Sequence, residues 1–219
     1  FASIYQHLSP NPYDFELFCF QRWFILKSVA AQLGLERCFY LDSDVLLFSD
    51  LSEVEKNYRQ LQLTVNFEQG PYSCFINSRA VLVDFCAYMM DLFRHHSAQM
   101  AADYHSWQAA GQTGGISDMH ALMHFIRDKG IKFTDTSAIV NDSTFDVVIH
   151  ESNGYAMEHG RKALRWIAGR PSVLHLTLNK PIRFHTLHLQ GNNKGLILEY
   201  HQLSGFWTTV IRLYNRFRG

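Results

Sequence analysis

The chain has 219 residues, enough for one substantial domain, and its 20 basic and 20 acidic side chains give a formal net charge of zero. This balance argues against nucleic acid as the main partner, because nucleic-acid-binding domains carry an excess of Lys and Arg. No apolar run is long enough to span a bilayer, and the N-terminus lacks the layout of a signal peptide. We therefore expect a cytoplasmic protein.

The first predicted helix covers residues 14–33, where apolar side chains recur at helical spacing and Gly34 is placed to end the helix. The next segment reads as a buried strand over residues 38–41, which continues over 45–48 after a short break. A helix followed by a buried strand is typical of an α/β sandwich.

The remaining predicted elements are shorter. Helical spacing and capping residues predict helices at 50–58, 81–93 and 118–129, and we expect the first half of 95–115 to continue the second of these. The end of that segment, G-Q-T-G-G, indicates a flexible loop that could be a mobile active-site segment. Alternating or apolar runs predict strands at 61–67, 131–133, 145–149 and 184–189.

The tail, residues 205–219, reads as an amphipathic helix with arginines on its polar side. It could rest on an anionic membrane surface, although packing on the domain is the stronger alternative for a helix this short. We see no internal repeat or linker, so we expect one domain over 1–219. The four cysteines stand apart in apolar contexts, which favours buried free thiols over disulfides or zinc.

Asp42 and Asp44 interrupt the apolar run F-Y-L-D-S-D-V-L-L-F. Carboxylates at the end of a buried strand are costly unless a positive charge meets them, and no basic residue lies nearby in the sequence. A divalent cation is the natural candidate, at the place where α/β sheets bind ligands. The alternative is a tight turn in which Asp makes only local hydrogen bonds.

A second motif, H-x-x-G-x-x-K, comprises His188, Gly191 and Lys194. An imidazole can complete a metal shell begun by carboxylates, a glycine lets the backbone approach a phosphate, and a lysine neutralises phosphate charge. Taken alone, His188 could be an ordinary strand residue and Lys194 a solvated turn residue. Together with the aspartate pair, the motif favours a binding site.

The two motifs resemble those of the nucleotide-sugar glycosyltransferases of the GT-A fold, in the group related to glycogenin, galactinol synthase and bacterial lipopolysaccharide galactosyltransferases. That group's Y-L-D-x-D-x-x-x-x-x-D-L is matched from Tyr40 to Leu51, and its late H-x-x-G-x-x-K by the motif above. The resemblance implies that Asp42 and Asp44 bind Mn²⁺ (or Mg²⁺) and the donor's ribose. It also implies that His188 is a further metal ligand and that Gly191 and Lys194 hold the diphosphate.

Weaker matches lie between the motifs. F-I-N-S-R-A-V-L-V is similar to the family's F-N-S-G-V-x-L-I segment, which implies that Asn77, as a catalytic residue, and Ser78 lie near the donor sugar. Arg79 stands where the family usually has glycine. Asp118 matches a family aspartate that contacts the sugar or acts as base. The alternative is that it only stabilises the N-terminus of its helix, where the helix dipole favours an acidic residue. Arg22 lies where relatives place a basic residue over the donor.

The resemblance implies an α/β fold, namely a Rossmann-like GT-A α/β/α sandwich with a mostly parallel mixed central sheet. Too few residues precede Asp42 for the family's opening strand, and the chain begins with Phe1, so we expect the N-terminal strand or strands to be missing. The implied activity is transfer of a hexose or N-acetylhexosamine from a UDP-sugar to a glycan or other hydroxyl acceptor. A sugar-nucleotide nucleotidyltransferase and a non-catalytic GT-A-like binding domain are the alternatives.

Overall fold

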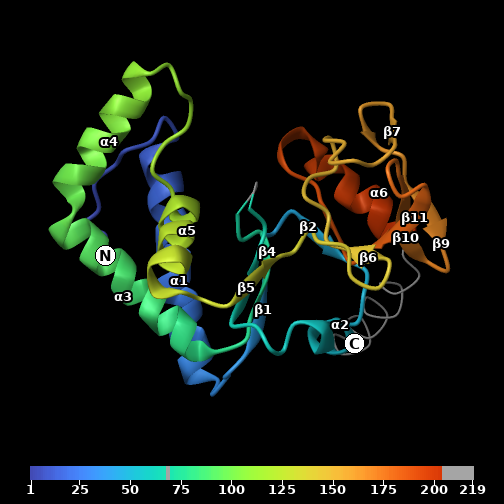
Figure 1. Ribbon diagram of the computed structural model, residues 1–219, viewed down its shortest axis with the longest axis horizontal. Coiled ribbons are helices and arrows are strands. Elements are labelled where there is room, and N and C mark those ends of the chain that lie inside the picture. Colours follow the sequence, from blue (N-terminus) through green and yellow to red (C-terminus); the bar gives the residue numbers. More distant parts are fainter. Residues whose placement is uncertain (68–69, 204–219) are drawn as a thin grey trace, which may run out of the picture. The chain divides into compact units, whose positions relative to one another are not determined.

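The computed structural model describes residues 1–67 and 70–203, with side chains up to Tyr200, and shows a mixed α/β chain (Figure 1). The predicted tail helix over 205–219 lies outside the described residues. The helices are α1 Tyr13–Gln32, α2 Leu51–Val54, α3 Arg79–His95, α4 Ser97–Ala109, α5 Asp118–Lys129 and α6 Leu196–Leu203, with 3-10 turns η1 Glu55–Asn57 and η2 Gly191–Gly195.

The strands are short and form mixed sheets. They are β1 Cys38–Leu41, β2 Val45–Leu47, β3 Leu63–Val65, β4 Ser73–Ile76, β5 Phe133–Asp135, β6 Ser143–Thr144, β7 Met157–Glu158, β8 Arg161–Lys162, β9 Arg165–Ile167, β10 Arg170–His175, β11 Lys180–Phe184 and β12 Thr186–His188. Two four-stranded sheets have the orders β1-β4-β3-β5 and β6-β11-β10-β9, and β12-β2 and β7-β8 form pairs. In the second of these sheets β11 runs parallel to β6, whereas β10 is antiparallel to both β11 and β9.

The chain divides into two compact units. Unit 1 contains residues 1–38, 61–63 and 75–133, and unit 2 contains 39–60, 64–74 and 134 onwards. In unit 1, α3 packs against α1, α4 and α5. Its core is aromatic: the rings of Trp23 and Phe85 meet edge to face at 5.1 Å, and Phe125 lies 5.3 Å from Phe85.

Unit 2 has its own apolar core beneath the β6-β11-β10-β9 sheet and the β12-β2 pair. Val173 of β10, Ile182 and Phe184 of β11, and Leu187 of β12 pack there with Ile149. Ile182 and Phe184 alternate with the exposed Arg183, because successive side chains on a strand point to opposite faces. The opposite face of this sheet carries Arg183 together with Arg170 and Ser172, and also the apolar Leu174 and Pro181.

The α/β class is confirmed, and several elements appear where the sequence predicted them. The predicted helix 118–129 matches α5, and the predicted helix 14–33 matches α1 to within a residue at each end. The four cysteines form no disulfide, as expected, but only Cys74 and Cys86 are buried, whereas Cys19 and Cys38 are partly exposed. Within the described ranges 1–67 and 70–203, no helix is long and apolar enough to cross a membrane. A GT-A arrangement stays a prediction, but the sheets are mixed and not mostly parallel: among the described registers β11–β6 is parallel, whereas β10–β11, β9–β10, β2–β12 and β3–β4 are antiparallel.

Other expectations were wrong. The segment after His95 does not continue α3 but begins a separate helix, α4, at Ser97. The expected strand at 145–149 is absent: this buried segment contacts β12 by single bonds, including Ile149 N–H to His188 O at 3.0 Å. The hairpins β7-β8 and β9-β10-β11 were not predicted, because their polar sequences lack a strong alternating pattern.

Candidate functional site

The two predicted motifs meet in unit 2 through the antiparallel pairing of β2 with β12. In this register His188 lies opposite Val45, the residue after Asp44. Two further backbone bonds fix the pairing at its ends, from Leu189 N–H to Asp44 O and from Phe48 N–H to His185 O, each 2.8 Å long. The pairing brings Asp44 and His188 side by side although they are far apart in the sequence.

The Asp44 carboxylate lies between an imidazole and an ammonium group. Its Oδ1 is 3.7 Å from His188 Nε2, and its Oδ2 is 3.3 Å from Lys194 Nζ. Asp44 and His188 are buried, whereas Lys194, on η2, is mostly exposed. A buried carboxylate with an exposed cation beside it is an arrangement that can receive a charged ligand from solvent.

The orientation of the His188 ring follows from its other contacts. Its Nδ1 lies 2.7 Å from the carbonyl oxygen of Val147, which can only accept, so Nδ1 carries the proton. The ring stacks on Tyr72 at 4.2 Å with 14° between the planes. In the neutral ring, Nε2 therefore turns its lone pair toward Asp44, as in metal-binding histidines whose second nitrogen donates to a carbonyl.

The separation of the two facing atoms also suits a shared cation. Two ligands bound at about 2.1 Å from one ion lie ~3 Å apart at a right angle and ~4.2 Å apart on opposite sides. The Nε2 to Oδ1 distance of 3.7 Å falls within that range. Asp44 and His188 can therefore hold one divalent ion with a small adjustment, or form an ion pair when the ring is protonated.

Asp42 occupies a turn beside the pair. Its carbonyl accepts from Val45 N–H at 3.2 Å, which closes the turn, and its own N–H donates to Tyr72 O at 2.8 Å. The Tyr40 hydroxyl donates to its carboxylate. The tight turn that the sequence analysis gave as the alternative is therefore present at Asp42. The same turn places Asp44 against His188.

The described residues, 1–67 and 70–203, contain no group of three or more His, Cys, Asp or Glu side chains placed to hold a metal. Asp42 does not complete a three-ligand set with Asp44 and His188, and its metal role stays a prediction. The chain offers two protein ligands, and the other positions around an ion would fall to water or to ligand oxygens, as is usual for Mg²⁺ at phosphate sites.

A buried ion pair lies behind His188 and was missed by the sequence reasoning. Asp146 Oδ2 accepts from His188 N–H at 3.1 Å, and Asp146 Oδ1 lies 2.8 Å from Lys162 Nζ; neither side chain is exposed. Burial raises the pKa of Asp146, and the Lys162 charge acts against that rise. The signal in the sequence is a lone carboxylate inside the apolar stretch F-D-V-V-I.

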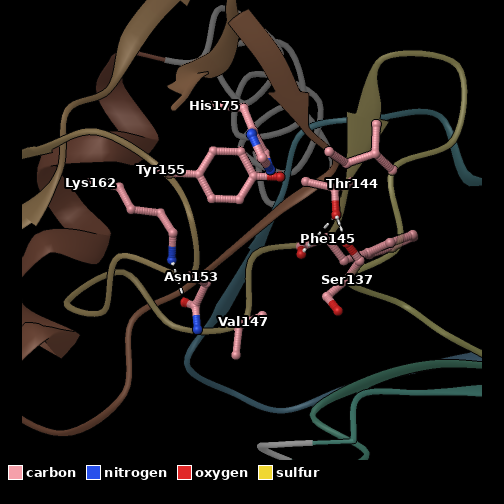
Figure 2. A pocket seen from close by; sticks show the side chains of 9 residues that line it. Ser137, Thr144, Phe145, Val147, Asn153, Tyr155, Lys162 and His175 are labelled. Atoms are coloured by element: carbon pink, nitrogen blue, oxygen red, sulfur yellow. Dashed lines mark hydrogen bonds between the residues drawn. The ribbon is translucent and has the colours of Figure 1, made fainter. Parts of the chain in front are cut away.

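Lys162 also forms one wall of a pocket of about 230 Å³, shown in Figure 2. Its ammonium donates to Asn153 Oδ1 at 3.1 Å and to the carbonyl of Val148 at 2.6 Å, in addition to the pair with Asp146. The rings of Tyr155 and His175 meet edge to face at 4.9 Å in another wall. Because its ammonium is buried and held by two hydrogen bonds and the ion pair with Asp146, Lys162 stabilises the local structure and is not a free charge in the pocket.

The other predicted site residues lie in unit 1, and two of them are brought together. Arg22 Nη2 donates to Asp118 Oδ2 at 2.7 Å, and the indole N–H of Trp23 donates to the same oxygen at 2.8 Å. Burial raises the pKa of Asp118, and the Arg22 charge and the hydrogen bonds oppose it. Asp118 thereby ties the start of α5 to α1.

Asn77 and Ser78 lie at the entry to α3. The Asn77 amide donates to Leu61 O at 3.1 Å, and Ser78 occupies the N-cap position without a side-chain cap bond. Arg79, at the position where the family has glycine, forms an ion pair with Glu36 at 2.8 Å. The roles of Arg22, Asn77, Ser78 and Asp118 toward a donor sugar stay predictions.

Comparison with known proteins adds no assignment. Family descriptions, curated proteins and solved structures were each searched with the chain, and none of them matches it.

Proposed function

We propose that the chain is a metal-dependent glycosyltransferase domain of the GT-A type, which transfers a hexose or N-acetylhexosamine from a UDP-sugar to a glycan or other hydroxyl acceptor. The supporting observation is that Asp44 lies within 3.7 Å of His188 and 3.3 Å of Lys194. These are the residues that the motif resemblance assigns to the metal and the diphosphate. The fold class is compatible with this proposal.

Each of the three residues has a distinct part in the proposed reaction. Asp44 and His188 would hold Mn²⁺ or Mg²⁺, which supplies Lewis-acid stabilisation of the departing diphosphate. Lys194 places a mobile positive charge beside Asp44, where it can pair with a phosphate oxygen as negative charge develops on the leaving group. The stacked Tyr72 and the Val147 carbonyl keep the His188 ring in the binding orientation.

The contacts of Asp118 bear on the stereochemistry. A base for an inverting transfer must reach the acceptor hydroxyl, but this carboxylate is buried and accepts bonds from Arg22 and Trp23. We therefore favour the retaining alternative, which does not need Asp118 as a base.

Titration calorimetry with Mn²⁺ and UDP tests the proposal. We expect UDP to bind only in the presence of Mn²⁺, and we expect Asp44→Asn and His188→Gln to weaken that binding at least about tenfold by removing one ligand each. Asp142→Asn is the matched control, because Asp142 is an exposed unit 2 carboxylate paired with Lys180. Metal-independent UDP binding, or equal affinities in all three variants, would refute the proposal.

A non-catalytic binding domain is the second candidate, and the observation that favours it is the two-ligand character of the site among the described residues. Such a domain would bind Mn²⁺ and UDP without turnover. Release of UDP from UDP-sugars in the presence of Mn²⁺ separates the two candidates, because only the enzyme produces it.

A further inference from the structure

A second pocket in unit 2, of about 200 Å³, is lined by Arg170 and Arg183 of the β6-β11-β10-β9 sheet and shares no residue with the Asp44–His188 site. The residues that matter to its chemistry are Ser49, Ser143, Arg170, Arg183 and His185, which we call the arginine pocket. They come from the loop before α2, from β6, β10 and β11, and from the residue after β11.

The sheet register explains why two arginines share this pocket. Arg183 pairs directly with Ser172 on β10, and Arg170 precedes Ser172 by two residues, so all three lie on one face. The opposite partner of Arg183 is Ser143 on β6. The Ser172 hydroxyl is buried and has no hydrogen-bond partner within the part of the chain that the structure describes. By the same register Arg165 of β9 lies opposite Ser172, so this sheet face carries three arginines beside small hydroxyl side chains, and of the three Arg170 and Arg183 line the pocket.

His185 is the buried member of the arginine pocket, with 8% of its surface exposed. Its Nδ1 lies 2.8 Å from Ser49 Oγ, and its ring packs 4.9 Å from that of Phe145. When Ser49 donates to Nδ1, the proton of the neutral ring is on Nε2, for which the described residues provide no acceptor. Burial, followed by the charges of Arg170 and Arg183, lowers the pKa of His185 to about 4. The ring is therefore a neutral donor at physiological pH.

The two arginines lack carboxylate partners. Among the described residues, the ion pairs of unit 2 involve other cations, and neither Arg170 nor Arg183 has a carboxylate within bonding distance. Two carboxylates, Asp50 and Glu53, also line the pocket. Glu53 pairs with Lys56 at 2.6 Å, and Asp50 accepts from Ser52 N–H at 2.9 Å, a bond that leaves its negative charge in place. Within the described residues neither carboxylate bonds a guanidinium group of the pocket, so both arginines keep their N–H donors available to a ligand.

We propose that the arginine pocket binds the phosphate group of a small ligand, with Arg170 and Arg183 pairing with its oxygens and His185 donating its Nε2–H at the inner side, while the Ser49 hydroxyl holds the ring in that tautomer. Two guanidinium groups match a dianion, and each offers a planar fork that bonds two oxygens at once. A single carboxylate would leave one of the forks unused. The site is independent of the proposed glycosyltransferase function.

Inorganic phosphate is the probe, titrated at constant ionic strength near neutral pH while the ring signals of His185 are followed by NMR. The signals are identified by their loss in His185→Asn. We expect a saturable shift and a rise in the pKa of His185, because a bound anion offsets the two arginine charges. Arg170→Gln and Arg183→Gln should each weaken binding at least about tenfold.

Two controls make the result decisive. Arg165→Gln removes a cation from the neighbouring strand β9, one that is exposed and paired with Glu158, and should leave the affinity unchanged. Asp44→Asn should also leave it unchanged, which separates this pocket from the proposed metal site. Arg170 and Arg183 are exposed, so their variants should fold. Arg183→Lys keeps the positive charge but loses the planar guanidinium group that bonds two oxygens, and it should bind phosphate more weakly than the native chain.

Three outcomes would overturn the proposal. They are an absent or non-saturating shift in the native chain, an equal response to acetate, and unchanged affinity when both Arg170 and Arg183 are replaced by Gln.

Discussion

Replacing Lys162 by Met should strongly destabilise unit 2. The substitution keeps an unbranched side chain that is one atom shorter, and it leaves the Asp146 carboxylate fully buried without its cation at 2.8 Å. It also removes the donors to Val148 O and Asn153. Breaking a buried ion pair from one side costs about 3–5 kcal/mol, because the remaining charge stays desolvated.

The matched double variant separates the pair from general damage. Asn at position 146 keeps an oxygen that can accept from His188 N–H, so Asp146→Asn combined with Lys162→Met removes both charges and retains that bond. Replacing both members of a buried pair is often nearly neutral. We expect the double variant to be more stable than the Lys162→Met single variant, with a coupling free energy of about 2 kcal/mol.

The pH dependence of the stability of Lys162→Met gives a second measure of the Asp146–Lys162 interaction. Burial already raises the pKa of Asp146, and without the lysine the folded-state pKa rises further above the value of about 3.9 in the unfolded chain. A group with a raised folded pKa stabilises fully below its unfolded pKa and loses that contribution as pH rises through the folded pKa. Relative to the native chain at the same pH, the variant should therefore lose least stability near pH ~4 and lose up to about 1.4 kcal/mol more per pH unit above it.

Urea unfolding followed by circular dichroism measures these free energies, and the two compact units call for a check that the transition is two-state. Calorimetry with Mn²⁺ on the same proteins tests whether loss of the pair also disturbs His188. A loss below about 1 kcal/mol in Lys162→Met, together with simple additivity in the double variant, would refute the view that the pair is buried and coupled.

The remaining predictions concern single residues. Asp118→Ala should cost about 3 kcal/mol in thermal or urea unfolding, because Arg22 and the Trp23 indole lose a shared buried acceptor, whereas Asp118→Asn should cost less. Gly115→Ala should cost at least ~2 kcal/mol, since its Cβ would lie 2.5 Å from a backbone carbon. Because the pKa of His185 is lowered to about 4, stability should fall as pH drops from about 6.5 to 4, by at most ~3 kcal/mol, and His185→Asn should flatten that fall.

The sequence predicts helices well where the apolar pattern agrees with capping residues. In α5, Ser117 lies before the first turn, Gly130 ends the helix with a positive φ of 61°, and the helically spaced Leu122, Phe125 and Ile126 are buried. In α1 the same reasoning located the helix but not its buried face. Phe18 and Ile25 are more than half exposed, whereas Phe20 and Trp23 form the core. Every side of this helix carries apolar residues, so periodicity cannot choose between them.

Strands were harder to predict because their partners are distant in sequence. The segment from Phe145 to Ile149 is as apolar as a strand, and each of its residues is buried. It nevertheless contains Asp146, whose carboxylate accepts from the His188 N–H and pairs with Lys162. The His188 N–H is thus bonded to a side chain and not to a carbonyl of a neighbouring strand. Strand propensity takes account of the apolar side chains but not of the contacts that Asp146 makes with residues distant in the sequence.

The spacing of H-x-x-G-x-x-K acquires a physical reason from the fold. His188 ends β12, opposite the residue after Asp44, so a register slip of one residue would turn its ring to the other face of the β2-β12 pair. Gly191 then has a φ of 63°, a left-handed conformation that other residues rarely adopt, and it starts the 3-10 turn η2. In a turn of three residues, the third position after Gly191 lies above it, which brings Lys194 back toward Asp44. The motif therefore corresponds to the end of β12, a change of chain direction at Gly191 and one helical turn. This arrangement explains why Asp44, which precedes β2, lies beside both His188 and Lys194.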